Sequence, residues 1–290
     1  MERIAREILS PDERKYLIKH VDIIGDIAVI KIHPFLIKKR FLIAKCLLKM
    51  LPNVRVVYRQ VAPTSGSYRI RGLEWLAGER RSITKAKEYG CSFIVDIERT
   101  FYTPRLSYEH MRVARLVRSG EVVVNMFAGI GPFSIIIAKY AEPRVVYSID
   151  INPVAYELMK RNIEINKVAD KVIPIHGDAA TVILRELINK ADRVLLPLPM
   201  LALKYLPFAL LALKSQGGFL HLYVNVFVPK DEKPCKRAER LCSMALNALQ
   251  VDCEVTSCRR VRSIGPRLTQ IVMDIFVRKG YCLNSLISSP

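Results

Sequence analysis

The sequence predicts an α/β protein in which a doubly wound, largely parallel sheet follows an N-terminal α+β domain. Three observations lead to this prediction. A strand, a glycine loop and a helix follow one another in residues 122–140, strands and helices alternate after them, and helices and strands mix without that alternation before residue 105. We therefore expect two domains, residues 1–104 and residues 105–290.

The glycine loop is the most informative stretch. In Val122–Tyr140, VVVNMFAGIGPFSIIIAKY, an apolar β-branched run leads through Gly129 and Gly131 into an apolar helical run. Glycines let the backbone approach a ligand closely. The next strand, Arg144–Ile149, ends at Asp150, where a carboxylate can accept hydrogen bonds from both hydroxyls of a ribose. This order indicates an adenosine-containing cofactor.

The loop also discriminates between cofactors. A dinucleotide site needs three backbone N–H groups around a pyrophosphate, but Pro132 has no N–H and Phe133 fills the region of the third glycine. S-adenosylmethionine carries no phosphate, and Asp178, which follows the strand Val172–Ile175, can reach its adenine amino group. The alternative, a glycine turn that merely packs, leaves Asp150 and Asp178 unexplained. The sequence therefore predicts S-adenosylmethionine as the cofactor.

The charge is strongly basic and unevenly distributed. The formal net charge is +19; residues 1–120 hold 24 Lys and Arg against 12 Asp and Glu, a net +12, which leaves +7 for the other 170 residues. Such an excess favours a polyphosphate partner over a merely solvated basic face. The basic residues of the front part that carry this prediction are Lys38, Lys39, Arg40, Arg55, Arg59, Arg69, Arg71, Arg80, Arg81, Lys85 and Lys87.

The cysteines, the charged N-terminal stretch and the apolar stretch argue against a metal site, a signal peptide and a membrane span. Seven cysteines show no C-x-x-C spacing and the histidines do not cluster, so we expect no metal site and predict no disulfide. Met1–His20 is charged throughout, which predicts no signal peptide. The apolar stretch Val194–Leu213 contains three prolines, which favours a strand ending at Leu196, a turn and a buried helix over a membrane span. We expect a cytoplasmic protein.

The N-terminal domain shows one clear helix start and one irregular strand. Ser10 precedes Pro11, and Glu13 follows at capping-box spacing, which predicts a short helix. Val21–Ile32 alternates around Gly25 like one strand with a kink or bulge. The other expected elements are a helix at Phe35–Leu51, strands at Val54–Val61, Ser67–Leu76 and Ser92–Ile97, and turns at Pro63–Gly66 and Ala77–Arg81.

The second domain is expected to begin with a basic amphipathic helix at Ser107–Ser119 and to close with an antiparallel pair of strands. The tail Gly280–Pro290 is expected to be loose. Between them we expect four strand–helix repeats whose strands begin at Val122, Val145, Val172 and Val194, a fifth strand at Gly218–Asn225, a helix at Ala238–Leu249, and the closing strands Val251–Ser257 and Gln270–Val277.

With these elements placed, the chain resembles the archaeal and eukaryotic tRNA (guanine-37 N1)-methyltransferase family and its wyosine-pathway relatives. The segments that carry the resemblance are IIGDIAVI, FYTPRLSYEHMR, NMFAGIGPFS, SIDINPVA, HGDA, DRVLLPLP, GGFLHLY and RRVRSIGPRLTQIVMDIFV. It implies a Rossmann-like class I methyltransferase sheet, tRNA and its anticodon loop as the partner, and a monomer. Family members often carry a further small N-terminal module, and we expect this chain to begin after it.

The resemblance also assigns roles. It implies that Glu109 is the general base, that Arg69, or the nearby Arg71, supports the target base, and that Pro197 stands where the family has a base-contacting Asn. A carboxylate suits this task because guanine N1 must lose a proton before its lone pair can accept a methyl group. The other reading of Glu109 is a solvated ion pair with Arg112 one helical turn away. We expect Arg69 and Arg71 to face the same way on one strand.

The remaining assignments follow the same pattern. Residues expected at the cofactor are His110, Phe127, Gly129, Gly131, Phe133, Asp150, Ile151, Asp178, Ala179 and Pro197. Residues expected at the substrate are Arg69, Arg71, Arg105 and Pro199.

Three departures from the family pattern keep the exact reaction open. Asn125 replaces an Asp, His110 replaces the Arg after the catalytic Glu, and Pro197 replaces the Asn of Asn-Leu-Pro. Because proline has no side-chain amide, the third change favours methylation at C7 of the tricyclic wyosine intermediate, alone or in addition to N1 of guanine. Transfer of the cofactor's aminocarboxypropyl arm is the alternative enzyme activity. A basic RNA-binding protein with a vestigial cofactor fold is the alternative class, which the intact glycines and acids disfavour.

Overall fold

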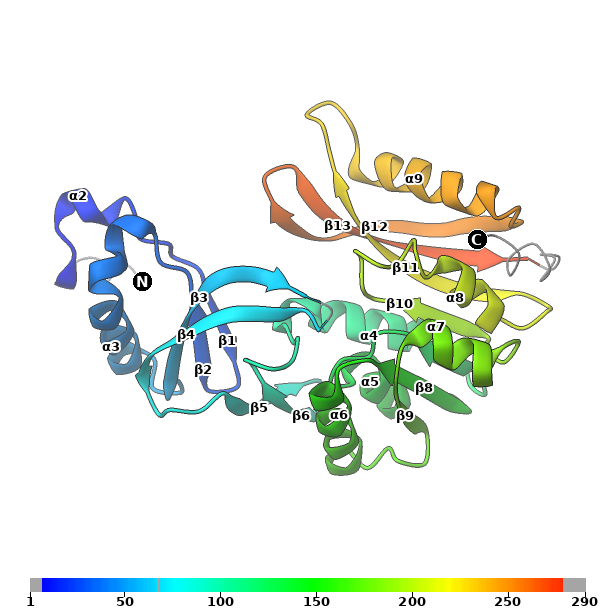
Figure 1. Cartoon of the computed structure of the whole chain (residues 1–290), viewed down its shortest axis with the longest axis horizontal. Helices are drawn as coiled ribbons and strands as arrows, with labels where there is room; N and C mark the ends of the chain where they lie inside the picture. The colour runs from blue at the N-terminus through cyan, green and yellow to red at the C-terminus, as the bar shows by residue number, and fades with distance from the viewer. Residues whose placement is uncertain (1–6, 67, 279–290) are drawn as a thin grey trace. The chain divides into compact units, whose positions relative to one another are not determined.

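The structure is a computed structural model that describes residues 7–66 and 68–278. The chain divides into two compact units, Met1–Pro104 and Arg105–Pro290. Figure 1 shows their helices and strands.

The first unit contains a four-stranded sheet in the order β1-β2-β3-β4. Only β2 and β3 are parallel, and the chain between them forms a helix whose residues Ile43 and Leu47 are buried against Val57 and Leu76. The elements are α2 (Pro11–Arg14), β1 (Val21–Ile24), β2 (Ile27–Ile30), the 3-10 helix η1 (Pro34–Lys39), α3 (Arg40–Met50), β3 (Val56–Ser65) and β4 (Ile70–Gly78). Helix α2 begins as predicted, since the Ser10 N–H donates to the Glu13 carboxylate at 2.8 Å.

The prediction of one kinked strand at residues 21–32 was wrong. β1 and β2 are antiparallel and pair Val21 with Ile30, joined by a two-residue turn at Gly25–Asp26. Gly25 has φ +57°, and a Cβ there would lie 2.1 Å from the Thr84 hydroxyl oxygen. Only glycine lets this turn lie so close to its neighbour, because any other side chain would meet Thr84 and be strained at that φ.

Strand β5 (Ile83–Glu88) was not predicted; it pairs with β6 (Cys91–Asp96) in a two-stranded sheet. Its residues alternate, with Thr84, Ala86 and Glu88 buried and Ile83, Lys85 and Lys87 exposed. The expected turns at 63–66 and 77–81 begin later, because β3 runs to Ser65 and β4 to Gly78.

The second unit is built on a seven-stranded sheet in the order β12-β13-β11-β10-β7-β8-β9. Strands β7 to β11 are parallel, and β13 is antiparallel to both of its neighbours, which confirms the predicted largely parallel sheet (Figure 1). The strands are β7 (Val122–Asn125), β8 (Val145–Asp150), β9 (Val172–His176), β10 (Arg193–Leu196), β11 (Gly218–Phe227), β12 (Cys253–Gly265) and β13 (Leu268–Val277). The helices are η2 (Pro104–Leu106), which spans the division between the units, α4 (Ser107–Leu116), α5 (Pro132–Tyr140), α6 (Pro153–Ile165), α7 (Ala179–Val182), a π-helix η3 (Ile183–Leu187), α8 (Leu206–Ala212) and α9 (Pro234–Ala248).

The closing strands pair as predicted but form a longer hairpin, and β13 lies between β11 and β12. β10 ends at Leu196 and α8 begins at Leu206, as expected for the apolar stretch. Within residues 7–66 and 68–278, no helix combines the length and the apolar character needed to cross a bilayer. The tail 280–290 lies outside the described residues.

Candidate functional site

The glycine loop joins β7 to α5 through two left-handed residues. Gly129 has φ +57° and Gly131 has φ +92°. Gly131 is the residue that caps α5, Pro132 is the first helical residue, and a Cβ on Gly131 would lie 3.1 Å from Met159 Cγ. Glycine is required here because an L side chain would be strained at this φ and crowded by the neighbouring helix.

Asp150 fastens this loop to the end of β8. Its Oδ2 accepts the Gly129 N–H at 2.6 Å and its Oδ1 accepts the Asn152 N–H at 2.9 Å. Burial raises the pKa of Asp150, although the two backbone hydrogen bonds oppose that effect. Each carboxylate oxygen has a second acceptor position, so Asp150 can hold the loop and still accept ribose hydroxyls.

Asp178 stands at the end of the neighbouring parallel strand, β9. Its Oδ1 accepts the Thr181 N–H at 3.1 Å, and this bond caps α7. Its Oδ2 accepts the Tyr205 hydroxyl at 2.5 Å. Burial raises the pKa of Asp178, but the bonds from Tyr205 and Thr181 outweigh burial and leave that pKa below its ordinary value. Tyr205 also meets the ring of Phe127 edge-on, with centroids 5.1 Å apart.

These residues fit an adenosyl group without a pyrophosphate. Asp150 and Asp178 follow adjacent parallel strands at the same edge of the sheet, where ligands of α/β sheets bind. Beside Asp150 the apolar side chain of Ile151 is 43% exposed, which provides a surface for a flat ring. Ala179 is buried at the start of α7.

Pro197 and Pro199 leave the sheet at this same edge. Both follow β10, which is hydrogen-bonded between β7 and β11, and both are half-buried. Neither residue can donate a backbone hydrogen bond.

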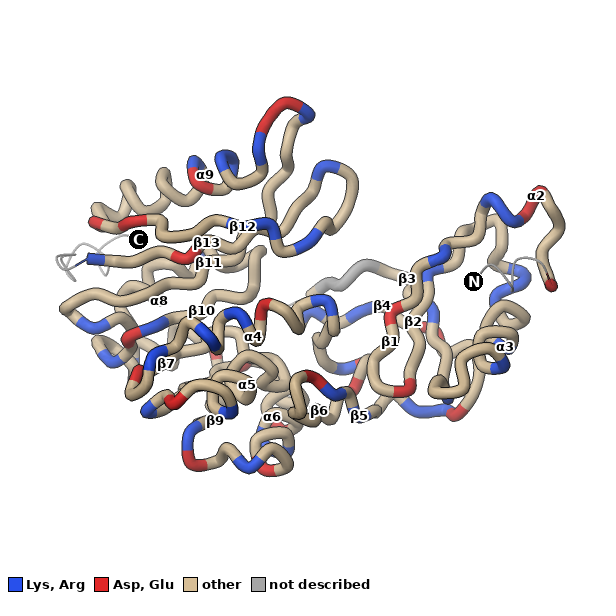
Figure 2. Tube along the Cα trace, turned by 180° about the vertical axis from the view of Figure 1, so that it is seen from behind, with Lys and Arg blue, Asp and Glu red and all other residues tan. Residues whose placement is uncertain are grey.

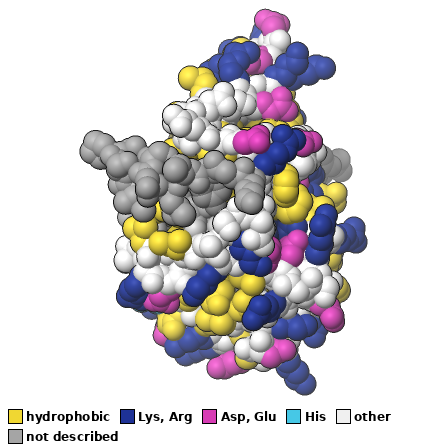
Figure 3. All heavy atoms as spheres, turned by 90° about the vertical axis from the view of Figure 1, so that its right-hand side faces the viewer, with side chains coloured by type: hydrophobic (Ala, Val, Ile, Leu, Met, Phe, Trp, Pro, Cys, Tyr) yellow, Lys and Arg dark blue, Asp and Glu magenta, His cyan; other side chains and the backbone are white. Residues whose placement is uncertain are grey.

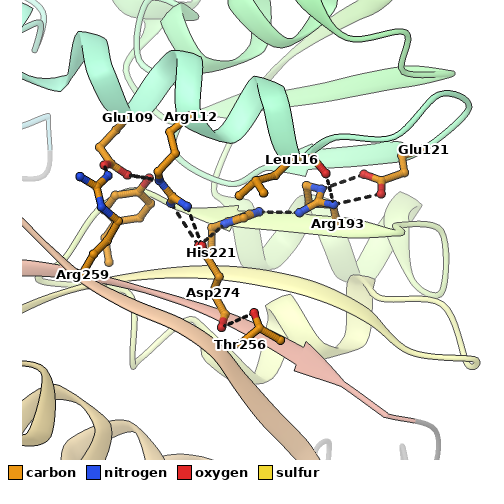
Figure 4. Close-up of polar contacts among 10 residues, drawn as sticks. Glu109, Arg112, Leu116, Glu121, Arg193, His221, Thr256, Arg259 and Asp274 are labelled. Atoms are coloured by element: carbon orange, nitrogen blue, oxygen red, sulfur yellow. Dashed lines mark hydrogen bonds and ion pairs between the residues drawn. The ribbon is translucent and has the colours of Figure 1, made fainter.

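Glu109 lies in the first turn of α4 and is only 2% exposed. Its Oε2 accepts from Arg112 Nε at 3.0 Å and from the Tyr223 hydroxyl at 3.1 Å, and its Oε1 accepts from Arg259 (Figure 4). The reading of Glu109 and Arg112 as a solvated surface pair is therefore wrong. The pair exists, but it is buried and belongs to a larger set of contacts.

Phe133 connects Glu109 to the glycine loop. This side chain, at the position of the third glycine, meets His110 edge-on at 4.5 Å between ring centroids and Tyr223 at 6.0 Å. Tyr223 in turn donates to Glu109. One aromatic cluster thus joins the expected base to the expected cofactor loop.

Behind Glu109, polar contacts run from Arg112 on α4 through β13, β11 and β10 to Glu121, which precedes β7 (Figure 4). Arg112 donates to both carboxylate oxygens of Asp274 at 2.5 and 3.1 Å, and His221 Nδ1 lies 2.6 Å from Asp274 Oδ1. His221 Nε2 lies 2.7 Å from an Arg193 guanidinium nitrogen, and Arg193 also donates to Glu121 at 2.7 and 3.0 Å.

These contacts fix the state of His221. A guanidinium can only donate, so Nε2 must accept, and the ring proton sits on Nδ1 and is donated to Asp274. Complete burial lowers the pKa of His221, in keeping with a neutral ring. Burial raises the pKa of Asp274, but the hydrogen bonds from His221 and Arg112 outweigh burial and hold that pKa at about 2.

Arg69 and Arg71 belong to the first unit, and they do not share a strand as expected. Arg69 lies in the turn before β4 with φ +56°, and burial lowers its pKa. Arg71 is on β4, donates to the Tyr102 carbonyl at 3.1 Å and lies 5.9 Å from the centre of the Phe101 ring. Arg105 is exposed at the start of the second unit.

The sequence did not identify three of the contacts. Tyr205, Tyr223 and Arg259 are distant in sequence from the carboxylates that they contact, and no local spacing marks them. In the part of the chain that the structure describes, no group of three or more His, Cys, Asp or Glu side chains could hold a metal ion.

Comparisons with known proteins give matches over most of the chain. Residues 84–253 match the model of the TRM5/TYW2 methyltransferase domain, and residues 1–81 match the TYW2 N-terminal domain. The chain is 40% identical over 259 residues to tRNA 4-demethylwyosine(37)-methyltransferase Taw21 from Saccharolobus solfataricus, covering 89% of this chain and 93% of that protein. It is 38% identical over 274 residues to tRNA (guanine(37)-N(1))-methyltransferase Trm5b from Pyrococcus abyssi, covering 94% and 79%.

Solved structures resemble it over nearly the whole chain. The structure of aTrm5 in complex with tRNALeu has a TM-score of 0.82 at 34% identity, covering 96% of this chain and 77% of that one. The structure of M. jannaschii TYW2 in complex with AdoMet has a TM-score of 0.66 at 26% identity, covering 90% and 100%. Because both domains match this family and a relative 40% identical covers most of the chain, the chain belongs to the TRM5/TYW2 methyltransferase family.

Proposed function

We propose that this protein is an S-adenosylmethionine-dependent tRNA methyltransferase that modifies the purine at position 37, next to the anticodon. The observation that carries the proposal is the aromatic cluster that joins Glu109 to the glycine loop through Tyr223 and Phe133. A proton acceptor and a cofactor loop in one site are what alkylation of a protonated ring nitrogen requires.

For the cofactor, we propose that Gly129 and Gly131 allow close approach of the backbone, that Asp150 accepts the ribose hydroxyls, and that Asp178 accepts the adenine amino group. When bound, S-adenosylmethionine supplies an electrophilic methyl group. The residues that complete its surroundings are His110, Phe127, Phe133, Ile151, Ala179 and Pro197.

For the substrate, we propose that Glu109 takes the proton from guanine N1 while a guanidinium, Arg69 or Arg71, stabilises the negative charge that develops on O6. Arg105 and Pro199 contact the nucleotide. The target base leaves the stack of the anticodon loop, which a single-stranded loop permits at modest cost. We also propose that the enzyme is a monomer and acts in the cytoplasm.

Two acceptor atoms fit this site. Pro197 offers no amide to guanine, and the similarity to Taw21 extends over most of both chains, so we propose C7 of 4-demethylwyosine as an acceptor besides N1 of guanine. Transfer of the aminocarboxypropyl arm is the alternative, since 34% identity over 211 residues also relates the chain to tRNA(Phe) (4-demethylwyosine(37)-C(7)) aminocarboxypropyltransferase.

The test uses two substrates and one readout. Purified protein and S-adenosylmethionine are incubated with tRNA carrying guanosine or 4-demethylwyosine at position 37, and the nucleosides are analysed by mass spectrometry. We expect a methyl group on one or both bases. Addition of the aminocarboxypropyl arm supports the alternative, and an unmodified position 37 in both substrates contradicts the proposal.

Pro197→Asn tests the choice of acceptor. The variant restores a side-chain donor and acceptor beyond β10, so N1 methylation is expected to rise relative to C7 methylation. Pro229→Asn is the control, because it makes the same change at an exposed proline that follows β11. Equal shifts in both variants would show that the effect does not come from position 197.

A further inference from the structure

The two oxygens of Glu109 accept hydrogen bonds from different residues. Oε2 receives hydrogen bonds from Arg112 and Tyr223, whereas Oε1 receives one from Arg259 (Figure 4). Three elements other than its own α4 therefore face this carboxylate, directly or through Arg112: β11 with Tyr223, β12 with Arg259, and β13 with Asp274.

The donors to Oε2 are fixed in place. The Arg112 side chain is 14% exposed and is forked onto Asp274, while Tyr223 is 1% exposed. Neither group can turn away without leaving a buried charge or hydroxyl without its partners, which is unfavourable.

Arg259 is held less firmly than Arg112 and Tyr223. It belongs to β12, the edge strand of the sheet, and its side chain is 31% exposed. Its guanidinium lies 4.7 Å from the centre of the ring of Tyr108, which is 63% exposed. Among the described residues, Glu109 is the only acidic side chain that pairs with Arg259. A partly exposed arginine on an edge strand can exchange partners more easily than a buried one.

We propose that Arg259 is a removable cover of Glu109. In the free protein its guanidinium occupies Oε1, and when RNA binds it exchanges the carboxylate for a phosphodiester and leaves Oε1 open. The exchange keeps the arginine paired, because its fork of donors suits phosphate as well as carboxylate. The inference deepens the proposed function, on which it rests.

The exchange frees the oxygen that accepts the proton in general-base catalysis. For Glu109 to act, the N1–H bond of the purine breaks and an Oε1–H bond forms, while the electron pair of the broken bond remains on N1. While the guanidinium of Arg259 lies over Oε1, it keeps the purine N1–H from approaching that oxygen, so proton transfer has to wait until Arg259 moves away. Covering Oε1 until RNA arrives confines proton acceptance to the bound complex.

Chemical labelling tests the cover without any reaction on tRNA. A carbodiimide with glycinamide labels accessible carboxylates, and peptide mass spectrometry locates the label. We expect Glu109 to stay unlabelled in the wild type and to be labelled in Arg259→Ala. Arg260→Ala is the matched control, because Arg260 is the next residue on β12 and is exposed, and it should leave Glu109 unlabelled. The exposed Glu142 serves as the internal reference in each sample.

Two labelling results would overturn the proposal: a Glu109 as reactive in the wild type as in Arg259→Ala, or a Glu109 unreactive in both. Thermal unfolding of each variant shows whether the label reports removal of the cover or loss of the fold. If Arg259→Ala does not fold, Arg259→Lys takes its place, because it keeps the charge but loses the fork, and partial labelling is then expected.

Steady-state kinetics distinguishes a cover from a catalytic group. In Arg259→Ala the KM for tRNA should rise about tenfold and the slope of log affinity against log salt should fall by about one, while kcat stays within about twofold. A kcat that falls a hundredfold with KM unchanged would instead assign Arg259 to the transition state and refute the cover. Should the wild type prove inactive on tRNA, the proposed function fails, and the labelling still decides whether Arg259 covers Glu109.

Discussion

Asp150 and Glu109 are both carboxylates of the second unit, but their partners give them different tasks. Asp150 receives backbone N–H groups from Gly129 and Asn152, so it holds the shape of the cofactor loop. Among the described residues, Glu109 receives only side-chain donors, which can rearrange when a substrate arrives. A substitution of Asp150 should therefore act on binding and one of Glu109 on chemistry.

Glu109→Gln should lower the rate of N1 methylation by roughly 10²–10⁴ and leave tRNA binding nearly unchanged, because the amide keeps the shape but accepts no proton. Single-turnover methylation at saturating cofactor measures the rate. The exposed Glu142→Gln is the control. A smaller loss on 4-demethylwyosine is expected, since attack from carbon allows the proton to leave later. Wild-type rates on both acceptors would remove Glu109 from the general-base role.

Asp150→Asn should weaken S-adenosylmethionine binding by about 1–3 kcal/mol, because the ribose hydroxyls and the Gly129 N–H lose a charged acceptor. Isothermal titration calorimetry measures the affinity. Asp170→Asn, an exposed residue of the same unit, should have no effect. An unchanged dissociation constant in Asp150→Asn would place the ribose elsewhere.

Local spacing was sufficient to place the glycine loop, Asp150 and Asp178 at the ends of their strands, since each follows a strand in a short segment. It could not find Arg259, which reaches Glu109 across 150 residues of sequence. It also misplaced Arg69, because alternation along a strand predicts a side-chain direction only while the backbone stays extended, and Arg69 has φ +56°. Contacts made by the tertiary fold leave no periodic signal.

At the level of elements, the clearest error concerned the β1–β2 hairpin. Continuous alternation across Gly25 suggested one strand, whereas a Gly-Asp pair between apolar runs is also a hairpin signal. Strand β5 was missed because ITKAKE contains no large buried apolar side chain, and its alternation rests on Thr84, Ala86 and Glu88. Short strands whose inward residues are small or polar carry weak patterns.

Two glycine substitutions test the hairpin. Gly25→Ala should destabilise the protein more than Gly66→Ala, although both residues have positive φ. The backbone conformation costs either variant about 1–2 kcal/mol, but only at Gly25 does the new methyl group meet Thr84 and the Lys85 carbonyl, while at Gly66 nothing lies within 4 Å. Thermal unfolding of both variants measures the difference. Equal losses would show that the turn does not pack against β5 as described.

The contacts of Asp274 with His221 and Arg112, which tie β13 to β11 and α4, should make stability depend on pH. Asp274 has a folded pKa of about 2, below its ordinary unfolded value, so it stabilises the protein above about pH 4 and this contribution is lost as pH falls toward 2. The contribution is roughly 2 kcal/mol at neutral pH. Urea unfolding between about pH 6 and 3 should show the gap between wild type and Asp274→Asn narrowing as pH falls. A gap independent of pH would contradict the assignment.

At the level of the whole molecule, the distribution of charge determines how strongly the protein attracts its tRNA partner. Basic positions occur along both units, including Arg259, Arg260 and Arg262 on β12, and on the face drawn in Figure 3 they lie at several places with acidic residues between them. Figure 2 shows the same distribution along the trace. The basic excess of the front part, +12 of the net +19, is therefore accompanied by further basic residues in the rest of the chain.

The affinity for tRNA should fall steeply with salt, and Arg80→Ala, Lys85→Ala or Lys87→Ala should each reduce the slope by about one. These three residues are exposed, whereas Arg81 is engaged by Asp26 at 2.5 and 3.0 Å and is left intact. Lys160→Ala, which removes a lysine paired with Glu157, is the control. Binding of tRNA that does not respond to salt would contradict the electrostatic contribution.

The position of β13 determines when the site can form during synthesis. This strand is encoded after β12, yet it lies between β11 and β12 and carries Asp274, which orients Arg112 beside Glu109. Glu109 leaves the ribosome long before residue 274 does, so a nascent chain can form its cofactor loop while its proton acceptor still lacks support. Pairings so distant in sequence also form late in folding. Competence in proton transfer should therefore appear only once β13 has been inserted, after the cofactor loop has formed.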